Sequence, residues 1–580
     1  MKKIIVLVQS KDIDPTLNAL GEIGVLHIEH ENAPINESVT TFKEKYESLT
    51  KAIRILPGAR EDARAARDPE DLVSQILNHI KEKEALIENL RKIKKDIEAW
   101  KEWEDFDPRL IDALKDEGIY IRLCKLNKKE LKNIPEGIIL EGLFKKGNVS
   151  YCAIISRNEE TLPFNTLSLP GESLHEMIAR EMQEEDKIKE IDEKLTNCAK
   201  YKNILLSHKT KLESLIEFNK VTAGMGQFEK LSYLGGYCPV YNIDLLEKTA
   251  EKERWGILVE EPDENDNVPT LVKNPRWIEI VKPLFQMIKT VPGYREMDVS
   301  LWFLMFFSVF FGMLIGDAGY GAVFFIINLL CHIKFKHSLK DRSIFFLMYL
   351  LSVCAVIWGL LSGTFFGQAW LSKRVEPLLP FLRDNMKIQE LCFLLGAFHL
   401  SIAHAWRLIR KLPSLKALSE VGWILMLWAA CFLAKSLILS QEFPGFGKWF
   451  FIAGAGLIIF FTNPEKNIFK TIGSGIGNFL LNIINSFTDV VSYIRLFAVG
   501  AATVAVADAF NQMALDIGHS TIIMGFLTAL VLLFGHTLNI LLGAMAILVH
   551  GVRLNVLEFS SHLNMEWSGV EYAPFKHKGD

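Results

Sequence analysis

Residues 487–506 read FTDVVSYIRLFAVGAATVAV and hold one permanent charge within an otherwise apolar run. The eighteen residues between Asp489 and Asp508 are uncharged except for Arg495. A guanidinium stays protonated at any physiological pH, and placing one at the centre of a bilayer costs from about 3 to more than 10 kcal/mol. The run therefore predicts a membrane-spanning helix in which Arg495 serves a function.

Small residues accompany Arg495 along one face of this predicted helix. They recur at spacings of three and four, at Thr488, Ser492, Ala498, Ala502, Ala505 and Ala509. Because small residues let a partner helix approach closely, we expect Arg495 to face protein and not lipid. Asp489 and Asp508 lie on other faces of the helix, so we expect the carboxylate partner of Arg495 on another chain. A buried structural ion pair and an arginine that snorkels to the interface are the alternatives.

A polar and small stripe also follows one face of the next apolar run, in which residues 517–552 contain no Asp, Glu, Lys or Arg. The stripe consists of His536, Asn539, Gly543, Ala546, His550 and Arg553. The two histidines are candidates to line a proton path, and hydrogen-bonded structure is the alternative. Arg553 closes the run, where a functional arginine and a snorkelling one both fit.

The chain divides into two unlike halves, because residues 1–297 are rich in charge and long apolar runs begin near residue 298. Runs of about 18–20 apolar residues are long enough to cross a bilayer. A single helix over 477–515 would be about 58 Å long against a hydrocarbon core of about 30 Å, so we expect the last two helices to be long and tilted. The runs predict eight spans, at 298–315, 317–333, 344–364, 390–409, 420–440, 447–462, 477–515 and 521–560.

Positive charge in the loops orients these spans. With eight spans and a cytoplasmic N-terminal half, loops 2–3, 4–5 and 6–7 and the C-terminus are also cytoplasmic. These segments are basic, whereas LSKRVEPLLPFLRDN, QEFPGFGK and MALDIGHS are mixed or nearly neutral, as the positive-inside rule requires. The basic residues are Lys334, Lys336, Lys340, Arg342, Arg407, Arg410, Lys411, Lys416, Lys466, Lys470, Lys576 and Lys578.

The first half combines short strand patterns with two long helical patterns. Strand-like runs occur at 3–8, 119–124, 137–142 and 149–155. Residues 73–100 and 174–218 carry narrow apolar stripes among charged residues, which is typical of a coiled coil; a packed helical bundle is the alternative. We predict a mainly α protein with a cytoplasmic region 1–297 and a transmembrane domain 298–580. The cytoplasmic region has a proximal globular α/β piece (1–40 and 220–297), a long antiparallel coiled-coil arm (about 41–105 and 174–219) and a distal α/β lobe (about 106–173).

The sequence offers no pattern for a metal, a cofactor or a nucleotide. The eight cysteines are scattered, without a CxxC pair or a His/Cys cluster at metal-ligand spacing. No GxxxxGK[ST] loop occurs, and Gly473-Ser474-Gly475-Ile476-Gly477 lacks the lysine. We therefore expect reduced structural cysteines and no catalytic, cofactor or metal site.

Several motifs, in their order along nearly the whole chain, resemble one family. Ser492-Tyr493-Ile494-Arg495-Leu496 looks like an SY-x-RL element, and His550-Gly551-Val552-Arg553-Leu554 with Glu558-Phe559 looks like a last-helix element. The chain resembles the membrane stator subunit of V-type and archaeal-type (A-type) rotary ATPases, called subunit a or subunit I. Further matches are Leu20-Gly21-Glu22-Ile23-Gly24, Phe310-Phe311-Gly312-Met313, Gly316-Asp317-Ala318-Gly319-Tyr320-Gly321, Gly363-Thr364-Phe365-Phe366-Gly367 and Gly396-Ala397-Phe398-His399-Leu400.

This resemblance implies a non-catalytic, non-rotating subunit that forms two offset ion half-channels against a ring of proteolipid c subunits. It implies that Arg495 faces the carboxylate of the ring and that Arg553 helps to shape the same interface. The remaining candidates for interface or half-channel polar groups are Ser492, His536, Asn539, His550 and Glu558.

The resemblance also implies partners and a location. The arm would dock on peripheral stalk subunits of the E/G type, and the other partners are the C/d-type central-stalk subunit, the catalytic ATPase sector reached through the stalks, and membrane lipid; no nucleic acid is expected. The short soluble domain and compact loops look like the bacterial or archaeal version, in the plasma membrane. H⁺ and Na⁺ both remain open as the ion, and so do ATP-driven pumping and ATP synthesis.

The sequence departs from eukaryotic members of this family at two positions. Leu481 and Thr503 stand where those members often carry ionisable groups. The alternative function is a secondary ion transporter or channel with a cytoplasmic coiled-coil domain, although such proteins seldom carry a long arm and no inverted repeat is visible. The cost of Arg495 disfavours a simple membrane tether.

Overall fold

A computed structural model describes residues 1–57, 67–127, 139–147, 149–157, 166–336, 341–368, 377–464, 468–518 and 520–576. The chain is mainly helical, with an α/β domain at its N-terminal end. It divides into two compact units: the first runs from Lys2 to Glu260 and takes in the tail from Pro574, and the second runs from Glu261 to Ala573. Lys340, Lys466 and Lys578 of the predicted loop-charge pattern lie outside the described residues.

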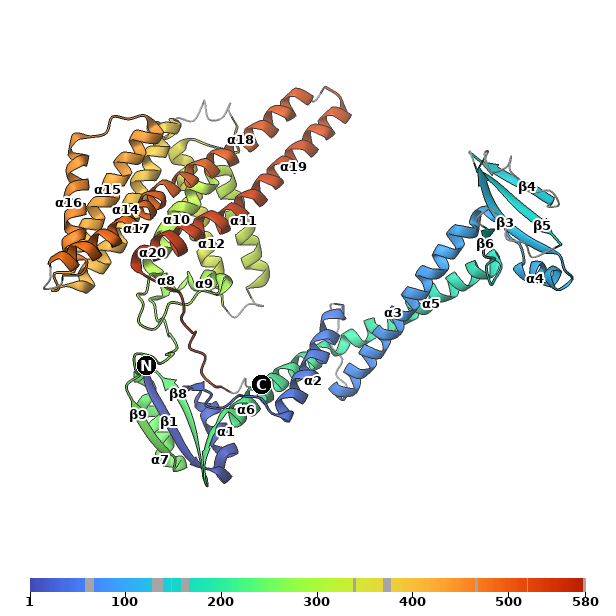
Figure 1. Cartoon of the computed structure of the whole chain (residues 1–580), viewed down its shortest axis with the longest axis horizontal. Helices are drawn as coiled ribbons and strands as arrows, with labels where there is room; N and C mark the ends of the chain where they lie inside the picture. The colour runs from blue at the N-terminus through green and yellow to red at the C-terminus, as the bar shows by residue number, and fades with distance from the viewer. Residues whose placement is uncertain are drawn as a thin grey trace. The chain divides into compact units, whose positions relative to one another are not determined.

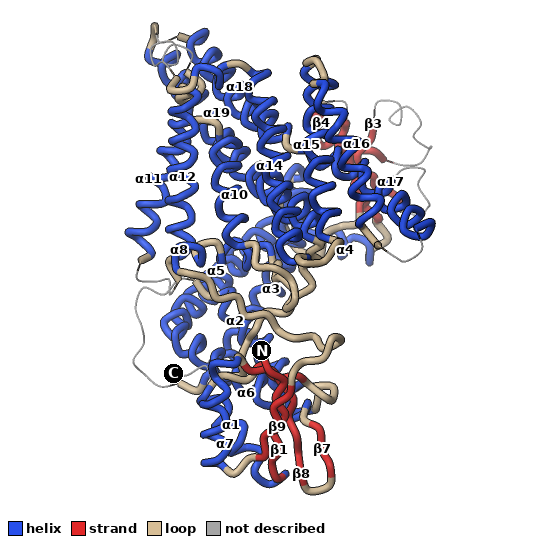
Figure 2. The backbone as a smooth tube through the Cα atoms, turned by 90° about the vertical axis from the view of Figure 1, so that its left-hand side faces the viewer, coloured by secondary structure: helices blue, strands red, loops and turns tan. Residues whose placement is uncertain are grey.

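A five-stranded antiparallel sheet forms the α/β part of the first unit. Its order is β2-β8-β1-β9, and β7 also pairs with β8. Alternate residues of β1, among them Ile4 and Val6, are buried, as the two-residue period of a strand requires, and helices α1 and α7 cover this face (Figure 2). The elements are β1 (Lys2–Gln9), α1 (Ile13–Ile23), β2 (His27–Glu29), β7 (Gly226–Phe228), β8 (Leu231–Cys238), α7 (Ile243–Glu253) and β9 (Gly256–Glu260).

Two pairs of long helices extend from this sheet. α3 and α5 run antiparallel, because Lys94 near the end of α3 contacts Glu185 in the first half of α5 at 2.8 Å, whereas the earlier Lys83 contacts the later Asp192. Buried apolar side chains from all four helices form one core. The antiparallel direction agrees with the sequence, and supercoiling into a coiled-coil arm stays a prediction. The helices are α2 (Glu37–Ile55), α3 (Pro69–Trp100), α5 (Leu174–Cys198) and α6 (Lys202–Gly224).

A small α/β lobe lies between α3 and α5 in the sequence. Its sheet has the order β4-β5-β3-β6, and its core is aromatic, with Trp103 and Tyr151 rings 5.1 Å apart. Residues 128–138, 148 and 158–165 of the predicted lobe lie outside the described residues. The elements are α4 (Pro108–Asp116), β3 (Tyr120–Asn127), β4 (Ile139–Lys146), β5 (Val149–Ser156) and β6 (Thr166–Leu167).

The second unit is a helical bundle. Judged by length and composition, six helices within the described residues are apolar enough to cross a membrane, and α10 and α16 are shorter apolar helices. The predicted count of eight spans therefore stays a prediction. The helices are α8 (Arg276–Glu279), α9 (Lys282–Ile288), α10 (Ser300–Ile315), α11 (Ala318–Phe335), α12 (Ser343–Ser362), α14 (Asn385–Lys411), α15 (Ala417–Leu439), α16 (Gly445–Phe461), α17 (Ile468–Ser492), α18 (Ile494–Ile517), α19 (Ile522–Ala546), the π-helical segments η7 (Ile547–Gly551) and η8 (Leu554–Phe559), and α20 (Ser560–Leu563).

The two compact units divide near residue 260, and the boundary at residue 297 between a cytoplasmic region and a transmembrane domain stays a prediction. Residues 261–297 belong to the helical unit. Val281 and Leu284 of this segment lie in the same buried core as Phe303 of α10, and Thr270 and Val291 form β-bridges with residues near the end of the bundle. The charged composition of 261–297 concealed these few buried apolar anchors.

The last two membrane helices are long, as predicted. An apolar helical run covers Gly475–Ile517 and another covers Ile522–Leu563. The first is divided at Tyr493, where the backbone tightens locally: the amide of Leu496 donates to the carbonyl of Tyr493 at 3.0 Å. α18 and α19 lie side by side and run obliquely to the other helices of the bundle (Figure 1).

Candidate functional site: an arginine cluster and two cavities

Arg495 lies in the first turn of α18. Its Nη1 is 3.5 Å from Oε1 of Glu558, and its side chain is 23% exposed. Within the chain itself, the last helical segment thus places a carboxylate near Arg495; a carboxylate of another chain as its partner stays a prediction. The two aspartates of its own helical run bind elsewhere: Asp489 accepts a hydrogen bond from His562 at 3.1 Å, and Asp508 accepts one from Gln512 at 2.7 Å.

Glu558 is shared by two arginines. Nε of Arg553 lies 3.4 Å from the same Oε1 that faces Arg495, and Glu558 is only 5% exposed. Residues five apart lie about 140° apart around an α-helix, so Arg553 and Glu558 would diverge there. The i→i+5 bonding of the π-helical segment η8 turns them toward one another. Nη1 of Arg495 and Oε2 of Glu558 are both buried and have no hydrogen-bond partner among the described residues.

The stripe of small residues on α18 is open surface in this chain. Ala498, Ala502, Ala505 and Ala509 are all exposed, and the partly exposed Arg495 continues their line. The opposite face of α18 packs tightly on α10: a Cβ added at Gly500 would lie 2.4 Å from the carbonyl oxygen of Met313. One face of the helix is therefore fixed to the bundle, and the other, which carries Arg495, is smooth and uncovered.

The polar residues of the stripe predicted on the last apolar run have two kinds of surroundings: two of them pack against neighbouring helices, and His550 lies near the arginine cluster in the sequence. His536 is hydrogen-bonded through Nδ1 to the hydroxyl of Tyr320 at 2.7 Å, and Asn539 donates to the backbone oxygen of Thr503 at 2.8 Å. These contacts fasten α19 to α11 and α18. His550 lies in η7, close to Arg553 in the sequence, and is partly exposed.

Ser492 donates to the backbone oxygen of Asp489 at 2.7 Å. Of the seven predicted site residues, the structure thus brings Arg495, Arg553 and Glu558 into one cluster. His536 and Asn539 serve helix packing, and Ser492 makes a local backbone contact.

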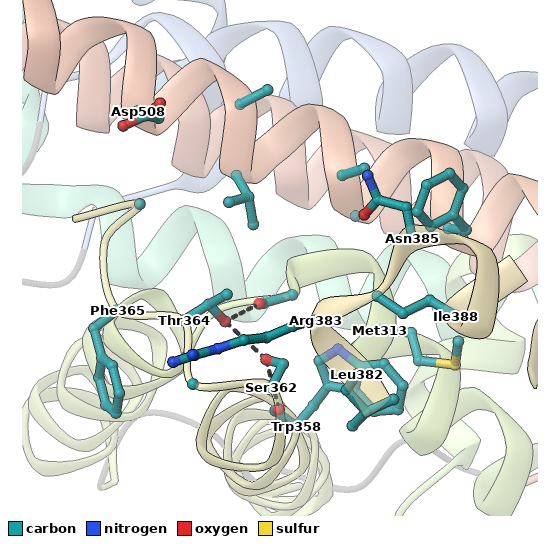
Figure 3. A pocket seen from close by; sticks show the side chains of 18 of the residues that line it. Met313, Trp358, Ser362, Thr364, Phe365, Leu382, Arg383, Asn385, Ile388 and Asp508 are labelled. Atoms are coloured by element: carbon teal, nitrogen blue, oxygen red, sulfur yellow. Dashed lines mark hydrogen bonds between the residues drawn. The ribbon is translucent and has the colours of Figure 1, made fainter. Parts of the chain in front are cut away.

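A cavity of about 620 Å³ opens beside the first half of α18 (Figure 3). It is lined by the ends of α10 and α12, by the segment before α14, and by residues of α18 from Leu496 to Asp508. Arg383 and Asp508 contribute charged groups from different walls, and the hydroxyl of Thr364 donates to the backbone oxygen of Gly316 at 2.5 Å. Its lining on α18 begins at Leu496, the residue after Arg495 in the sequence, and the cavity lies at the N-terminal end of α14.

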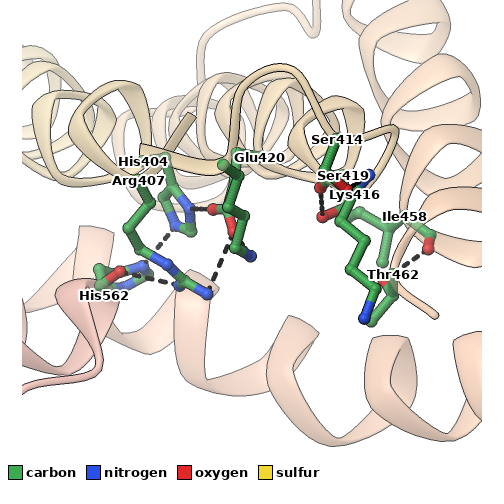
Figure 4. Close-up of polar contacts among 10 residues, drawn as sticks. His404, Arg407, Ser414, Lys416, Ser419, Glu420, Ile458, Thr462 and His562 are labelled. Atoms are coloured by element: carbon green, nitrogen blue, oxygen red, sulfur yellow. Dashed lines mark hydrogen bonds and ion pairs between the residues drawn. The ribbon is translucent and has the colours of Figure 1, made fainter. Parts of the chain in front are cut away.

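A second, polar cavity of about 330 Å³ lies at the opposite end of α14. Four side chains in it form a continuous hydrogen-bonded row: His404 Nδ1 donates to Glu420 at 2.7 Å, His404 Nε2 is 2.9 Å from Nδ1 of His562, and His562 Nε2 donates to Asp489 at 3.1 Å. Arg407 and Lys411 also contact Glu420 (Figure 4 shows Arg407, His404, Glu420 and His562). The row ends at Asp489, less than two helical turns before Arg495 in the sequence.

This row was not predicted from the sequence. A signal was present: Glu420 stands near the start of an apolar run, and the preceding run ends with His404, Arg407 and Lys411 at spacings of three and four. In a helical hairpin, a carboxylate at the start of one helix lies beside the basic end of the helix before it. His562 carried no comparable signal, because it follows the last predicted span.

The chain is similar over its full length to curated proteins. It is 32% identical to the V-type ATP synthase subunit I of Borreliella burgdorferi, over 99% of both chains, and 29% identical to V-type ATP synthase subunit I 1 of Treponema pallidum, over 100% of this chain and 99% of that one. It is 26% identical to the A-type ATP synthase subunit I of Methanocaldococcus jannaschii, over 60% of this chain and 56% of that one.

A crystal structure of the cytoplasmic N-terminal domain of subunit I aligns with 45% of this chain and all of that chain, at 14% identity and a TM-score of 0.24, too low to establish a shared fold. No family model matches. The first two relatives nevertheless cover nearly the whole sequence, including both halves. The chain belongs to the subunit I family of V-type and A-type ATP synthases, the membrane subunits of rotary ATPases.

Proposed function

We propose that this chain is the non-rotating subunit that couples ion movement to rotation of a ring of proteolipid c subunits. The observation that carries the proposal is the position of Arg495, which is partly exposed in line with a face of exposed alanines. Small residues permit close approach of a neighbouring helix, so a rotor helix can bring a carboxylate to the guanidinium. At an effective dielectric of about 20, a pair 4 Å apart is worth about 4 kcal/mol, enough to favour the ionised carboxylate as it passes.

The two cavities support a pair of half-channels. They lie at opposite ends of α14, a helix of 27 residues and therefore about 40 Å long. The smaller cavity is lined by the end of α14 and the start of α15, on either side of the basic loop that we predict to be cytoplasmic. The larger one opens on the other side of Arg495 along the helical run. Arg495 follows Asp489 of the smaller cavity and precedes Leu496 of the larger one in the sequence. In the proposed cycle, an ion that enters by one cavity travels on the ring to reach the other.

The hydrogen-bonded row in the smaller cavity is suited to carry a proton. Both terminal carboxylates accept, so His404 needs a proton on Nδ1 and His562 needs one on Nε2. The ring nitrogens that face one another, His404 Nε2 and His562 Nδ1, are 2.9 Å apart, which is close enough for a proton to pass between the rings. A proton can therefore shift along the row without movement of the chain.

The first unit provides the attachment that a stationary subunit needs. Its antiparallel helices carry ion pairs on exposed surfaces, such as Lys94 with Glu185, and we propose that they form a coiled-coil arm that binds peripheral stalk subunits of the E/G type. A central-stalk subunit of the C/d type and the catalytic sector complete the proposed assembly. The proposed location is a bacterial or archaeal plasma membrane, with the first unit in the cytoplasm.

Replacement of Arg495 tests this function in the assembled complex. R495A is expected to assemble and to lose ATP-driven ion transport, because nothing then favours the ionised ring carboxylate or blocks leakage between the half-channels. R495K is expected to fail as well, because burial can deprotonate a lysine. R410A, at an exposed arginine near the end of α14, is the matched control and should transport normally. Coupled transport by R495A at the normal rate would refute the proposal.

A further inference from the structure

Glu558 contacts Arg495 in a manner unlike a structural ion pair. Structural Arg–carboxylate pairs are commonly bidentate, with N–H···O distances near 2.8 Å. Here the nearest atoms are 3.5 Å apart, and both Nη1 of Arg495 and Oε2 of Glu558 are buried without a hydrogen-bond partner among the described residues. A partly exposed arginine and a buried glutamate are thus close enough to attract one another and too far apart to be locked together.

The charges of the cluster are unbalanced. Two guanidiniums, Arg495 and Arg553, face one carboxylate, which leaves a net charge of +1. One further carboxylate from outside the chain would neutralise the group. Arg495 is the member that lies beside the exposed face of α18, so an arriving carboxylate meets Arg495 while Arg553 retains Glu558 at 3.4 Å.

We propose that Glu558 is the resting counter-ion of Arg495. It neutralises the guanidinium while no ring carboxylate is present, and it remains with Arg553 when one arrives. This inference rests on the proposed function and adds a positioning residue that acts through Arg495. The weak contact with Glu558 keeps the attraction of Arg495 for a ring carboxylate at an intermediate strength. Without Glu558, the arginine would hold each ring carboxylate too long. With a hydrogen-bonded Glu558, it would not bind the ring carboxylate at all.

The main test is E558Q, which keeps the size of the side chain and removes its charge. In the assembled complex, we expect the maximal rate of ATP-driven transport to fall at least 10-fold, because release of the ring carboxylate becomes slow. We expect the number of ions moved per ATP to equal that of the wild type. The half-saturating ion concentration should stay within about threefold of the wild-type value, because Arg495 and both cavities are intact. Acidification of vesicles and uptake of Na⁺ are both recorded.

R553Q is expected to cause the opposite defect, a loss of coupling and not a loss of rate. Without Arg553, Glu558 has only Arg495 as a partner, so it competes with the ring carboxylate. We expect fewer ions per ATP through leakage, with less loss of ATP turnover than in E558Q. A purely structural role of the cluster predicts the same defect in both variants, and that result would overturn the proposal.

The control is E442Q, a charge removal at an exposed glutamate in the α15–α16 loop, which should behave as wild type. If E558Q does not assemble, E558D tests the proposal instead, because aspartate keeps the charge on a shorter side chain. A transport rate between that of E442Q and zero supports the proposal. A wild-type transport rate overturns it. R495A assayed in parallel separates the two proposals. Loss of transport in R495A with a normal rate in E558Q removes only the resting counter-ion, whereas normal transport in R495A removes the proposed function itself.

Discussion

Glu420 neutralises several basic side chains at one buried point. It is 1% exposed, Arg407 lies 3.1 Å from Oε1, and Lys411 and His404 contact it as well. E420Q preserves the shape but leaves these groups without a counter-charge, which typically costs about 3–5 kcal/mol. We expect its free energy of unfolding in detergent micelles to fall by about 3 kcal/mol in a denaturant titration. E442Q, at an exposed site, should change it by less than about 0.5 kcal/mol; equal stability of the two variants would contradict this assignment.

The surroundings of a single residue could be predicted where they depend on one helix alone. A single helical wheel places Arg495 and the small residues on one face, and in the structure the alanines of that face of α18 are exposed. The counter-charge of Arg495 did not follow from the wheel, because Glu558 lies on another helix, and a wheel drawn for an ordinary α-helix turns Glu558 away from Arg553. The π-helical geometry that joins them has no reliable sequence signal.

At the scale of elements, the contact between α18 and α10 depends on a glycine. A Cβ at Gly500 would lie 2.4 Å from a backbone oxygen of α10, whereas a Cβ at Gly456 of α16 would meet nothing within 4 Å. Gly→Ala favours a helix by about 1 kcal/mol, and overpacking against backbone costs about 1–3 kcal/mol.

We therefore expect G500A to lower the thermal unfolding temperature of the chain in detergent and G456A to maintain or raise it. Because both substitutions carry the same helix propensity, a decrease of similar size in both would show that the close approach of α18 to α10 is unimportant.

Elements were predictable from long apolar periodicity and less so from tertiary contacts. Apolar runs located the membrane helices, and alternation located β1. The division of the long C-terminal run at Tyr493 was not visible, because it reflects contacts with α14: the Tyr493 hydroxyl is hydrogen-bonded to His399 at 2.8 Å, and a Cβ at Gly396 would lie 2.6 Å from the tyrosine ring. These residues lie almost one hundred positions from Tyr493, outside any local pattern.

At the scale of the whole molecule, the number of membrane crossings depends on α10 and α16. These helices have 16 and 17 residues, about 24–26 Å at 1.5 Å per residue, slightly short of a hydrocarbon core of about 30 Å. Tilt cannot help a short helix, so each must be accommodated by local thinning or by flanking residues. The distribution of basic loop residues favours eight crossings over six, because only then do the basic loops share one side with the N-terminal half.

Labelling of single cysteines decides between these topologies. In a variant without native cysteines, one new cysteine at a time is introduced by E22C, S414C, E442C or N463C, at four positions that are all exposed. Eight crossings predict that an impermeant maleimide labels E442C from one side of a sealed vesicle and the other three variants from the opposite side. If α10 does not cross, S414C is labelled from the side opposite to E22C. If α16 does not cross, E442C and N463C are labelled from the same side. Either result would contradict the proposed half-channels, because the smaller cavity or the first unit would then lie on the opposite side of the membrane from the one proposed.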